Sequence, residues 1–278
     1  MKIHDILNTA SMPLASPTYP KGPYRFVNRE YMIITYESDP DAIREAVPEP
    51  LEPDGSNTVL YEFIRMPDST GFGDYTETGI VIPCRYKGEM VNFTAQMYLD
   101  CEPPISGGRE IWGFPKKLAD VSLKVNRDTL AGRLEYAGQP VALASMAYKH
   151  ENVVCGNGGH DHRGIACDPS PLRQKLAKTQ VNLKLIPDVD GRLAIAQLVA
   201  YNLADIVIRG GWHSPARLHL IPHVNAPVAD LPVRKVLGGS HFVADLTLPY
   251  GRVIHDYLAE APCHLASPMP RSLAAQSA

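Results

Sequence analysis

The chain has 278 residues, of which 45% are hydrophobic and 21% charged, and its formal net charge is −3 at pH 7. It can bury a substantial core, as one large β domain or two smaller ones, and its charge gives no reason to expect nucleic acid or membrane partners. Residues 1–16 lack a long apolar run, so we expect no signal peptide or transmembrane span, and five scattered cysteines are typical of free thiols in the cytoplasm.

The chain begins with a segment, residues 1–24, that contains four prolines. We expect an extended arm here, which lies either across a neighbouring subunit or across its own domain. Aromatic and β-branched side chains at 31–36 predict a strand. Residues 38–41 then start a helix with a proline in its first turn, and Pro48 ends that helix after Val47.

Strands are predicted through the middle of the chain. Residues 59–66 carry apolar side chains on both faces, 90–99 shows the clearest alternation, and 121–125, 129–136 and 141–148 continue the strand pattern. In the first of these, Glu62 shares a face with Leu60 and Ile64, where a carboxylate must be paired, protonated or part of a site. The strand at 90–99 is expected to place one set of side chains on one face: Val91, Phe93, Ala95, Met97 and Leu99. Asn92, Thr94 and Gln96 are expected on the other face.

The second half starts with a loop at 151–170, followed by a short helix at 172–178 and by short strands at 182–186, 193–200, 206–209, 217–221 and 241–248. Gly191 is expected at the left-handed position of a hairpin. Residues 231–237, closed by two glycines, predict another short helix. A mobile tail is expected at 259–278. The pattern therefore predicts a mainly β domain at 25–258, either a barrel or a sandwich, largely antiparallel and with few helices.

Two adjacent lysines, Lys116 and Lys117, follow a Trp, a Phe and a Pro. A lysine pKa is ordinarily ~10.4, but apolar burial or a nearby cation lowers it by up to ~3–5 units and frees a nucleophilic amine. In an extended segment consecutive side chains point to opposite faces, so only one of the two enters a given pocket easily. For the dipeptide alone, a solvated pair of lysines is the commoner structure.

Residues 108–118 form the phrase Gly-Arg-Glu-x-x-x-x-Pro-Lys-Lys-Leu, which resembles the active-site segment of the acetoacetate decarboxylase family. Further segments resemble that family in the same order, at 19–24, 28–31, 47–52, 75–77, 97–100 and 231–233. The resemblance covers about residues 10–258. It implies a closed β barrel or cone around the site, a lysine imine that decarboxylates acetoacetate without an added cofactor, and a large homo-oligomer.

The resemblance also implies roles for individual residues. Lys116 is implied to form the imine, and Arg29, Glu62 and Glu77 match the family's active-site arginine and glutamates. We expect Lys117 to point elsewhere, in a salt bridge or as a cation that depresses the Lys116 pKa, although strand geometry favours desolvation as the cause. Arg109 and Glu110 are expected to form an ion pair behind the lysines. Four apolar side chains are candidate pocket walls: Phe26, Met97, Trp112 and Phe114.

Two other functions stay open from the sequence: an imine-forming aldolase or dehydratase acting on another oxo acid, and a barrel that only binds small apolar ligands. The joint presence of Arg29, Glu62 and Glu77 favours the decarboxylase. Residues 155–167 contain two cysteines and two histidines, but their spacing differs from the closely paired ligands of zinc sites, so we expect no metal. No glycine-rich phosphate loop is present, so we expect no nucleotide cofactor.

Overall fold

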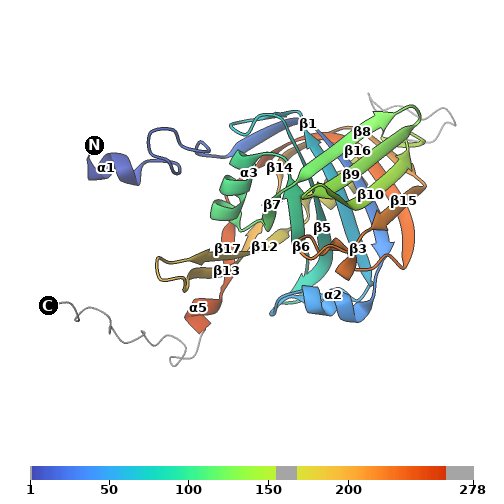
Figure 1. Ribbon diagram of the computed structural model, residues 1–278. Coiled ribbons are helices and arrows are strands. Elements are labelled where there is room, and N and C mark those ends of the chain that lie inside the picture. Colours follow the sequence, from blue (N-terminus) through green and yellow to red (C-terminus); the bar gives the residue numbers. More distant parts are fainter. Residues whose placement is uncertain (1, 155–167, 261–278) are drawn as a thin grey trace.

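Strands make up most of the part of the chain that the computed structural model describes, residues 2–154 and 168–260 (Figure 1). In order, the strands are β1 (Tyr24–Glu37), β2 (Glu52–Pro53), β3 (Thr58–Met66), β4 (Asp68–Ser69), β5 (Tyr75–Tyr86), β6 (Glu89–Leu99), β7 (Lys116–Leu118), β8 (Asp120–Asn126), β9 (Thr129–Tyr136), β10 (Gln139–Ala147), β11 (Glu151–Val154), β12 (Gln180–Pro187), β13 (Leu193–Tyr201), β14 (Ala204–Ser214), β15 (Ala216–Leu220), β16 (Lys235–Leu248) and β17 (Arg252–Asp256). The helices are α1 (Ile3–Leu7), α2 (Pro40–Ala46), α3 (Glu102–Gly107), the π-helix η1 (Gly108–Trp112), α4 (Ser170–Ala177), the 3-10 helix η3 (Val228–Asp230) and α5 (Tyr257–Glu260).

The described strands form two sheets. The larger has 13 strands and runs in the order β11-β14-β16-β1-β3-β5-β6-β12-β13-β17, with β2, β4 and β7 attached at its sides. The smaller has four, in the order β15-β10-β9-β8, and lies across part of the larger sheet in Figure 1. Pairing is antiparallel except that β12 and β7 run parallel to β6. The predicted mainly β, largely antiparallel fold with few helices is therefore confirmed.

The closed barrel that the resemblance implied is not confirmed. A barrel closes only when the two edge strands of a sheet pair with each other. In the described part of the chain, the path of the larger sheet begins at β11 and ends at β17, which pair with β14 and β13 respectively. The smaller sheet instead covers one face of the larger one, and side chains of both sheets share a buried cluster.

Alternation along the central strands separates two apolar cores on the two faces of the larger sheet. Met32 of β1 and Phe63 of β3 point into the core that the two sheets share. Ile33 and Ile64, their sequence neighbours, point to the opposite face and into a second cluster. That second face carries the candidate site.

The helices predicted near residues 40 and 172 are present as α2 and α4, but the helix predicted at 231–237 is wrong. β16 begins at Lys235, and its glycines pair with β1, Gly238 with Thr35 and Gly239 with Ile34. A local glycine signal was overridden here by pairing with a distant strand.

The alternation predicted along β6 is wrong beyond Ala95. The register with β5 passes from Val81–Thr94 to Ile80–Gln96, which leaves Ala95 as the extra residue of a bulge. As a result Phe93 packs between the sheets, whereas Met97 packs on the other face. The bulge places Met97 on the same side as Asn92 and Thr94.

The N-terminal arm extends away from the sheets and carries α1, a short helix that was not predicted from the sequence (Figure 1). Its apolar side chains Ile3 and Leu7 are exposed, whereas Tyr19 at the base of the arm is buried against the second cluster. The expected tail at 259–278 lies almost entirely outside the described residues. No helix formed by residues 2–154 or 168–260 is long and apolar enough to span a bilayer.

Candidate active site

A narrow cavity of about 70 Å³ lies on the face of the larger sheet that carries the second apolar cluster. One buried water needs roughly 10–15 Å³ by the same kind of measure, so the cavity suits a ligand of only a few heavy atoms. Its wall is mostly aromatic and aliphatic. Five acidic or basic side chains also line it: Arg29, Glu62, Glu77, Lys116 and Lys175.

Lys116 is placed by the unusual backbone that precedes it. The π-helix η1 ends at Trp112, the φ of 75° at the following Gly113 is left-handed, and β7 then runs beside β6 with Lys116 opposite Met97. Arg109 Nη1 donates a hydrogen bond to the Lys116 carbonyl oxygen at 3.1 Å. A Cβ atom at Gly108 would lie only 2.8 Å from Lys116 Cδ and 3.2 Å from its Nζ, so this glycine leaves the space that the lysine side chain fills.

The Lys116 amine is removed from water. The residue is 6% exposed, and its Nζ lies 4.9 Å from the centre of the Phe114 ring. Burial lowers the pKa of Lys116 below its ordinary value, Glu77 opposes that shift, and Arg29 adds to it. Burial is the largest of these influences, and Lys117 is not among them.

Glu77 connects the two buried cations. Its Oε1 accepts a hydrogen bond from Arg29 Nη2 at 3.1 Å. Its Oε2 lies 3.3 Å from Lys116 Nζ, but without the alignment of a hydrogen bond. Arg29 Nε and the Tyr31 hydroxyl are buried with no hydrogen-bond partner among the described residues, so polar groups remain available to a ligand.

A bulge in β1 aims Arg29 at this carboxylate. The pairing with β16 shifts between Phe26 and Arg29, and Asn28 adopts a left-handed φ of 55°. Asp245 fixes the bulge by accepting a hydrogen bond from the Asn28 N–H at 2.9 Å. Asp245 was not singled out from the sequence, because only the fold brings it beside this turn.

Glu62 reaches the cavity from β3. Burial raises the pKa of Glu62 to about 7, against the attraction of Lys175 and Arg29 and with some help from Glu77. The carboxyl group therefore changes its protonation near neutral pH, which suits a group that both gives and accepts protons.

The expected walls divide into two groups. Phe26, Met97 and Phe114 line the cavity. Trp112 lies behind Phe114, with 6.2 Å between the ring centres, and its Nε1 donates to the Pro249 carbonyl oxygen at 3.0 Å. Trp112 thus supports a wall and does not form one.

Lys117 lies on the opposite side of β7 from the cavity. Its Nζ donates to the Asn225 carbonyl oxygen at 2.5 Å and lies 4.7 Å from the centre of the Tyr136 ring. A carbonyl oxygen thus takes the place of the expected salt-bridge partner.

Arg109 and Glu110 are held by separate partners in place of the expected ion pair. Arg109 binds the lysine backbone, whereas Glu110 Oε2 accepts a hydrogen bond from Tyr19 OH at 2.5 Å. Both contacts fix the segment that presents Lys116, one to the strand and one to the N-terminal arm.

Lys175 is the charged lining residue that sequence reasoning missed. It comes from α4, a helix far from the lysine segment in sequence, and only the fold brings it to the cavity. A signal was present: Leu172 and Leu176 are spaced to lie on one helix face, and Lys175 lies three residues after Leu172 on that face.

The Cys/His segment at 155–167 lies outside the described residues. Among residues 2–154 and 168–260, no group of three or more Cys, His, Asp or Glu side chains is arranged to hold a metal ion. Cys84 and Cys101 are free thiols.

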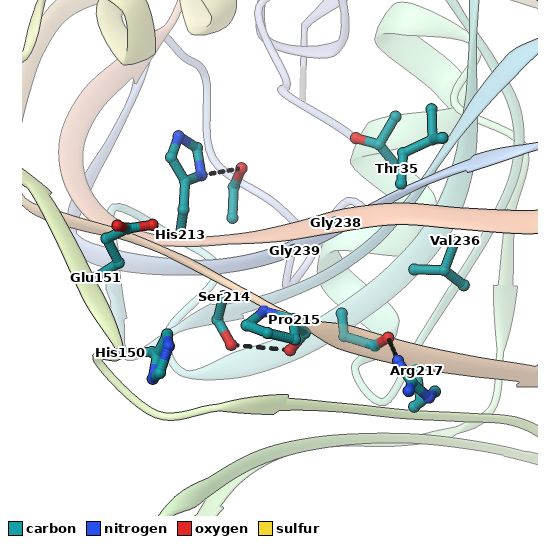
Figure 2. A pocket seen from close by; sticks show the side chains of 13 residues that line it. Thr35, His150, Glu151, His213, Ser214, Pro215, Arg217, Val236, Gly238 and Gly239 are labelled. Atoms are coloured by element: carbon teal, nitrogen blue, oxygen red, sulfur yellow. Dashed lines mark hydrogen bonds between the residues drawn. The ribbon is translucent and has the colours of Figure 1, made fainter.

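A larger and more open pocket of about 710 Å³ lies where β14, β15 and β16 meet, and it shares no lining residue with the cavity (Figure 2). Several of its polar side chains form hydrogen bonds with their neighbours. Ser240 Oγ lies 3.2 Å from His213 Nδ1, and the Ser214 hydroxyl donates to the Pro215 carbonyl oxygen. Its described lining contains no lysine, so the smaller cavity, with its buried amine and carboxylates, is the better candidate for chemistry despite its size.

Comparison with known proteins gives a consistent result. A model of the family described as acetoacetate decarboxylase (ADC) matches residues 11–258. The chain is 54% identical over 249 residues to an acetoacetate decarboxylase of Acidiphilium cryptum, covering 90% of this chain and 96% of the relative. It is 52% identical over 264 residues to one of Burkholderia multivorans, covering 94% and 100%. A crystal structure of acetoacetate decarboxylase from Legionella pneumophila superposes with a TM-score of 0.81 at 48% sequence identity, covering 91% of this chain and 96% of that one.

Proposed function

The chain belongs to the acetoacetate decarboxylase family, and we propose that it cleaves acetoacetate into acetone and carbon dioxide through an imine on Lys116. The reaction is the one that the relatives' names describe. The environment of Lys116 supports the imine. Its side chain is 6% exposed, its pKa is lowered, and its Nζ lies 3.3 Å from the Glu77 carboxylate. Acetoacetate decarboxylase is itself a standard example of an enzyme whose lysine is activated by its surroundings.

In the first step the neutral Lys116 amine attacks the ketone carbon of acetoacetate. Loss of water then gives a cationic imine, with nitrogen bonded to the former carbonyl carbon. Two protons must reach the departing oxygen, one of them from the amine itself. Glu62, with a pKa of about 7, is placed on the cavity wall to supply or take up a proton in this exchange.

In the second step the bond between the α-carbon and the carboxylate breaks. Its electron pair moves into the imine, which becomes a neutral enamine, and carbon dioxide leaves. Arg29 is hydrogen-bonded to Glu77, which suits a positioning role better than a clamp on the carboxylate. Such a clamp would stabilise the substrate more than the transition state and would slow the reaction.

In the last step the enamine takes a proton at carbon, and water hydrolyses the resulting imine to acetone and free Lys116. Glu62 and Glu77 are the carboxyl groups beside the cavity that can transfer these protons. The residues supply every proton transfer themselves, so we propose no added cofactor and no metal.

The size of the cavity supports a small β-keto acid as the substrate, since about 70 Å³ leaves little room beyond acetoacetate. We also propose a cytoplasmic, homo-oligomeric enzyme. The free thiols of Cys84 and Cys101 suit a reducing compartment, and the exposed apolar side chains of the arm suit contact with a second copy.

Borohydride trapping tests this proposal. Reduction in the presence of acetoacetate should fix a stable adduct on Lys116, identified by peptide mapping, together with release of carbon dioxide before reduction. An imine-forming aldolase would give the adduct without carbon dioxide release, and a binding protein would give neither. An adduct at another lysine, with Lys116 unmodified, would contradict the assignment.

A further inference from the structure

Lys175 lines the same cavity as Lys116 and Glu62, and the reaction outlined above gives it no role. Of the five lysine, arginine and glutamate side chains that line the cavity, Lys175 comes from a helix, α4, whereas the other four come from strands. A lysine beside an apolar wall needs an explanation, because removing an ammonium group from water is costly unless a partner offsets it.

The position of α4 is fixed by its apolar face. Leu172 and Leu176 are buried in the cluster that surrounds the cavity, and Leu176 lines the cavity itself. Gly211 of β14 lets the helix approach closely, since a Cβ atom there would lie 2.5 Å from Leu172 Cδ1. Lys175 is therefore held at the cavity by packing on both sides of it in sequence.

Glu62 lines the same cavity as Lys175 and is the charged group that acts on it, although the two side chains form no ion pair. Burial lowers the pKa of Lys175, and Glu62 opposes that shift. Among the charges that act on Glu62, Lys175 is the strongest attraction, ahead of Arg29, while Glu77 repels. Two phenols that line the cavity, Tyr31 of β1 and Tyr201 of β13, also interact electrostatically with this carboxyl group.

We propose that Lys175 is a positioning residue of the active cavity, whose ammonium group controls whether Glu62 carries a proton near neutral pH. With Lys175 charged, Glu62 exists in both forms and serves as acid and base in turn. Without it, burial and the repulsion from Glu77 keep Glu62 protonated over a wider pH range, so the carboxyl group cannot accept a proton at neutral pH. This inference rests on the proposed imine reaction.

The helix offers a matched control in Lys178, which directly follows α4. Burial lowers the pKa of Lys178 as well, but the carboxylate that acts on it is Asp54, and it does not line the cavity. The experiment therefore compares the pH profiles of kcat/KM for the wild type, Lys175→Met, Lys175→Arg and Lys178→Met. The expected result is a shift of the acidic limb to higher pH by about one unit in Lys175→Met. Lys175→Arg should return the acidic limb to its wild-type position, and Lys178→Met should leave the limb unshifted.

A double variant shows whether Lys175 acts through Glu62. In a Glu62→Gln background, Lys175→Met should have no further effect on the residual activity, because the group that it controls is gone. Equal effects in both backgrounds would overturn the proposal. So would a pure rise in KM with an unshifted profile, which would make Lys175 a binding site for the substrate carboxylate.

Trapping with acetone, a neutral ketone, separates this proposal from the imine reaction. Borohydride should still fix acetone on Lys116 in Lys175→Met, since the amine remains. If the wild type itself gives no adduct, the imine reaction fails. If adducts form and the profiles of wild type and Lys175→Met superpose, only the role of Lys175 fails.

Discussion

Lys116 and Lys117 are adjacent on β7, yet their amines lie in two different regions of the molecule. Lys116 enters a narrow cavity, where it meets Phe114 and Glu77 and is largely shielded from water. Lys117 lies on the other side of the strand, partly exposed, against Asn225 and Tyr136. The same side chain is thus a buried amine with a lowered pKa at one position and a partly exposed group at the next, because alternation along the strand lets only Lys116 enter the cavity.

The largest expected effect separates the two lysines directly. Lys116→Met should lower kcat by about 10⁴-fold or more, the scale on which loss of a covalent nucleophile acts. The matched variant Lys117→Met should keep most of the activity. Rates of carbon dioxide release from acetoacetate, with circular dichroism as a check on folding, measure both. Equal losses in the two variants would contradict the distinction between the regions.

Glu77→Gln should have the next largest effect, because Glu77 holds both Arg29 and the Lys116 amine. We expect kcat to fall by about 10²–10⁴-fold. The carboxylate raises the Lys116 pKa against the effect of burial, so its removal should lower that pKa further. The pH dependence of trapping with acetone reports the shift, and a rise in the pKa would contradict this electrostatic account.

Gly108→Ala tests the space beside Lys116. The added Cβ would lie 2.8 Å from Lys116 Cδ, so the lysine must move, and a displacement of about 1 Å can cost about 10²-fold in rate. Gly108 has helical angles, φ −62° and ψ −45°, so the backbone itself accepts alanine and the clash with Lys116 is the effect tested.

Gly238→Ala is the control for this substitution, since a Cβ there would meet no atom within 4 Å. Its kcat should match the wild type. Unchanged kcat in Gly108→Ala would show that the lysine tolerates displacement, whereas lower melting temperatures would indicate damage to the fold.

Lys117→Gln should have the smallest effect, below about threefold in kcat. Lys117 does not line the cavity, and the loss of its contact with the Asn225 carbonyl oxygen changes stability by about 0.5 kcal/mol or less. A steady-state assay across pH gives the answer. A drop of tenfold or more would mean that its charge reaches the cavity.

Much of this arrangement could be predicted from the sequence where the signal is local. The period of a strand predicted that Glu62 shares a face of β3 with Leu60 and Ile64, and extended geometry predicted that the two lysines lie on opposite sides of β7. The family resemblance pointed to Lys116, Glu77 and Arg29, which the structure brings together in one cavity.

The features that could not be predicted depend on contacts between distant segments. The bulge at Ala95 reverses the faces of β6 because of its register with β5, and a strand replaces the helix predicted at 231–237 because β16 pairs with β1. Lys175 reaches the cavity only because α4 packs over β14. Periodicity within one segment carries no information about such neighbours.

We expect that burial, and not the neighbouring Lys117, lowers the Lys116 pKa. The direct measurement is that pKa, from the pH dependence of acetone trapping on Lys116, in the wild type and in Lys117→Gln. We predict a value below that of an ordinary lysine in both proteins, with little difference between them. An ordinary value in the wild type, or a rise to it on removal of Lys117, would contradict the account.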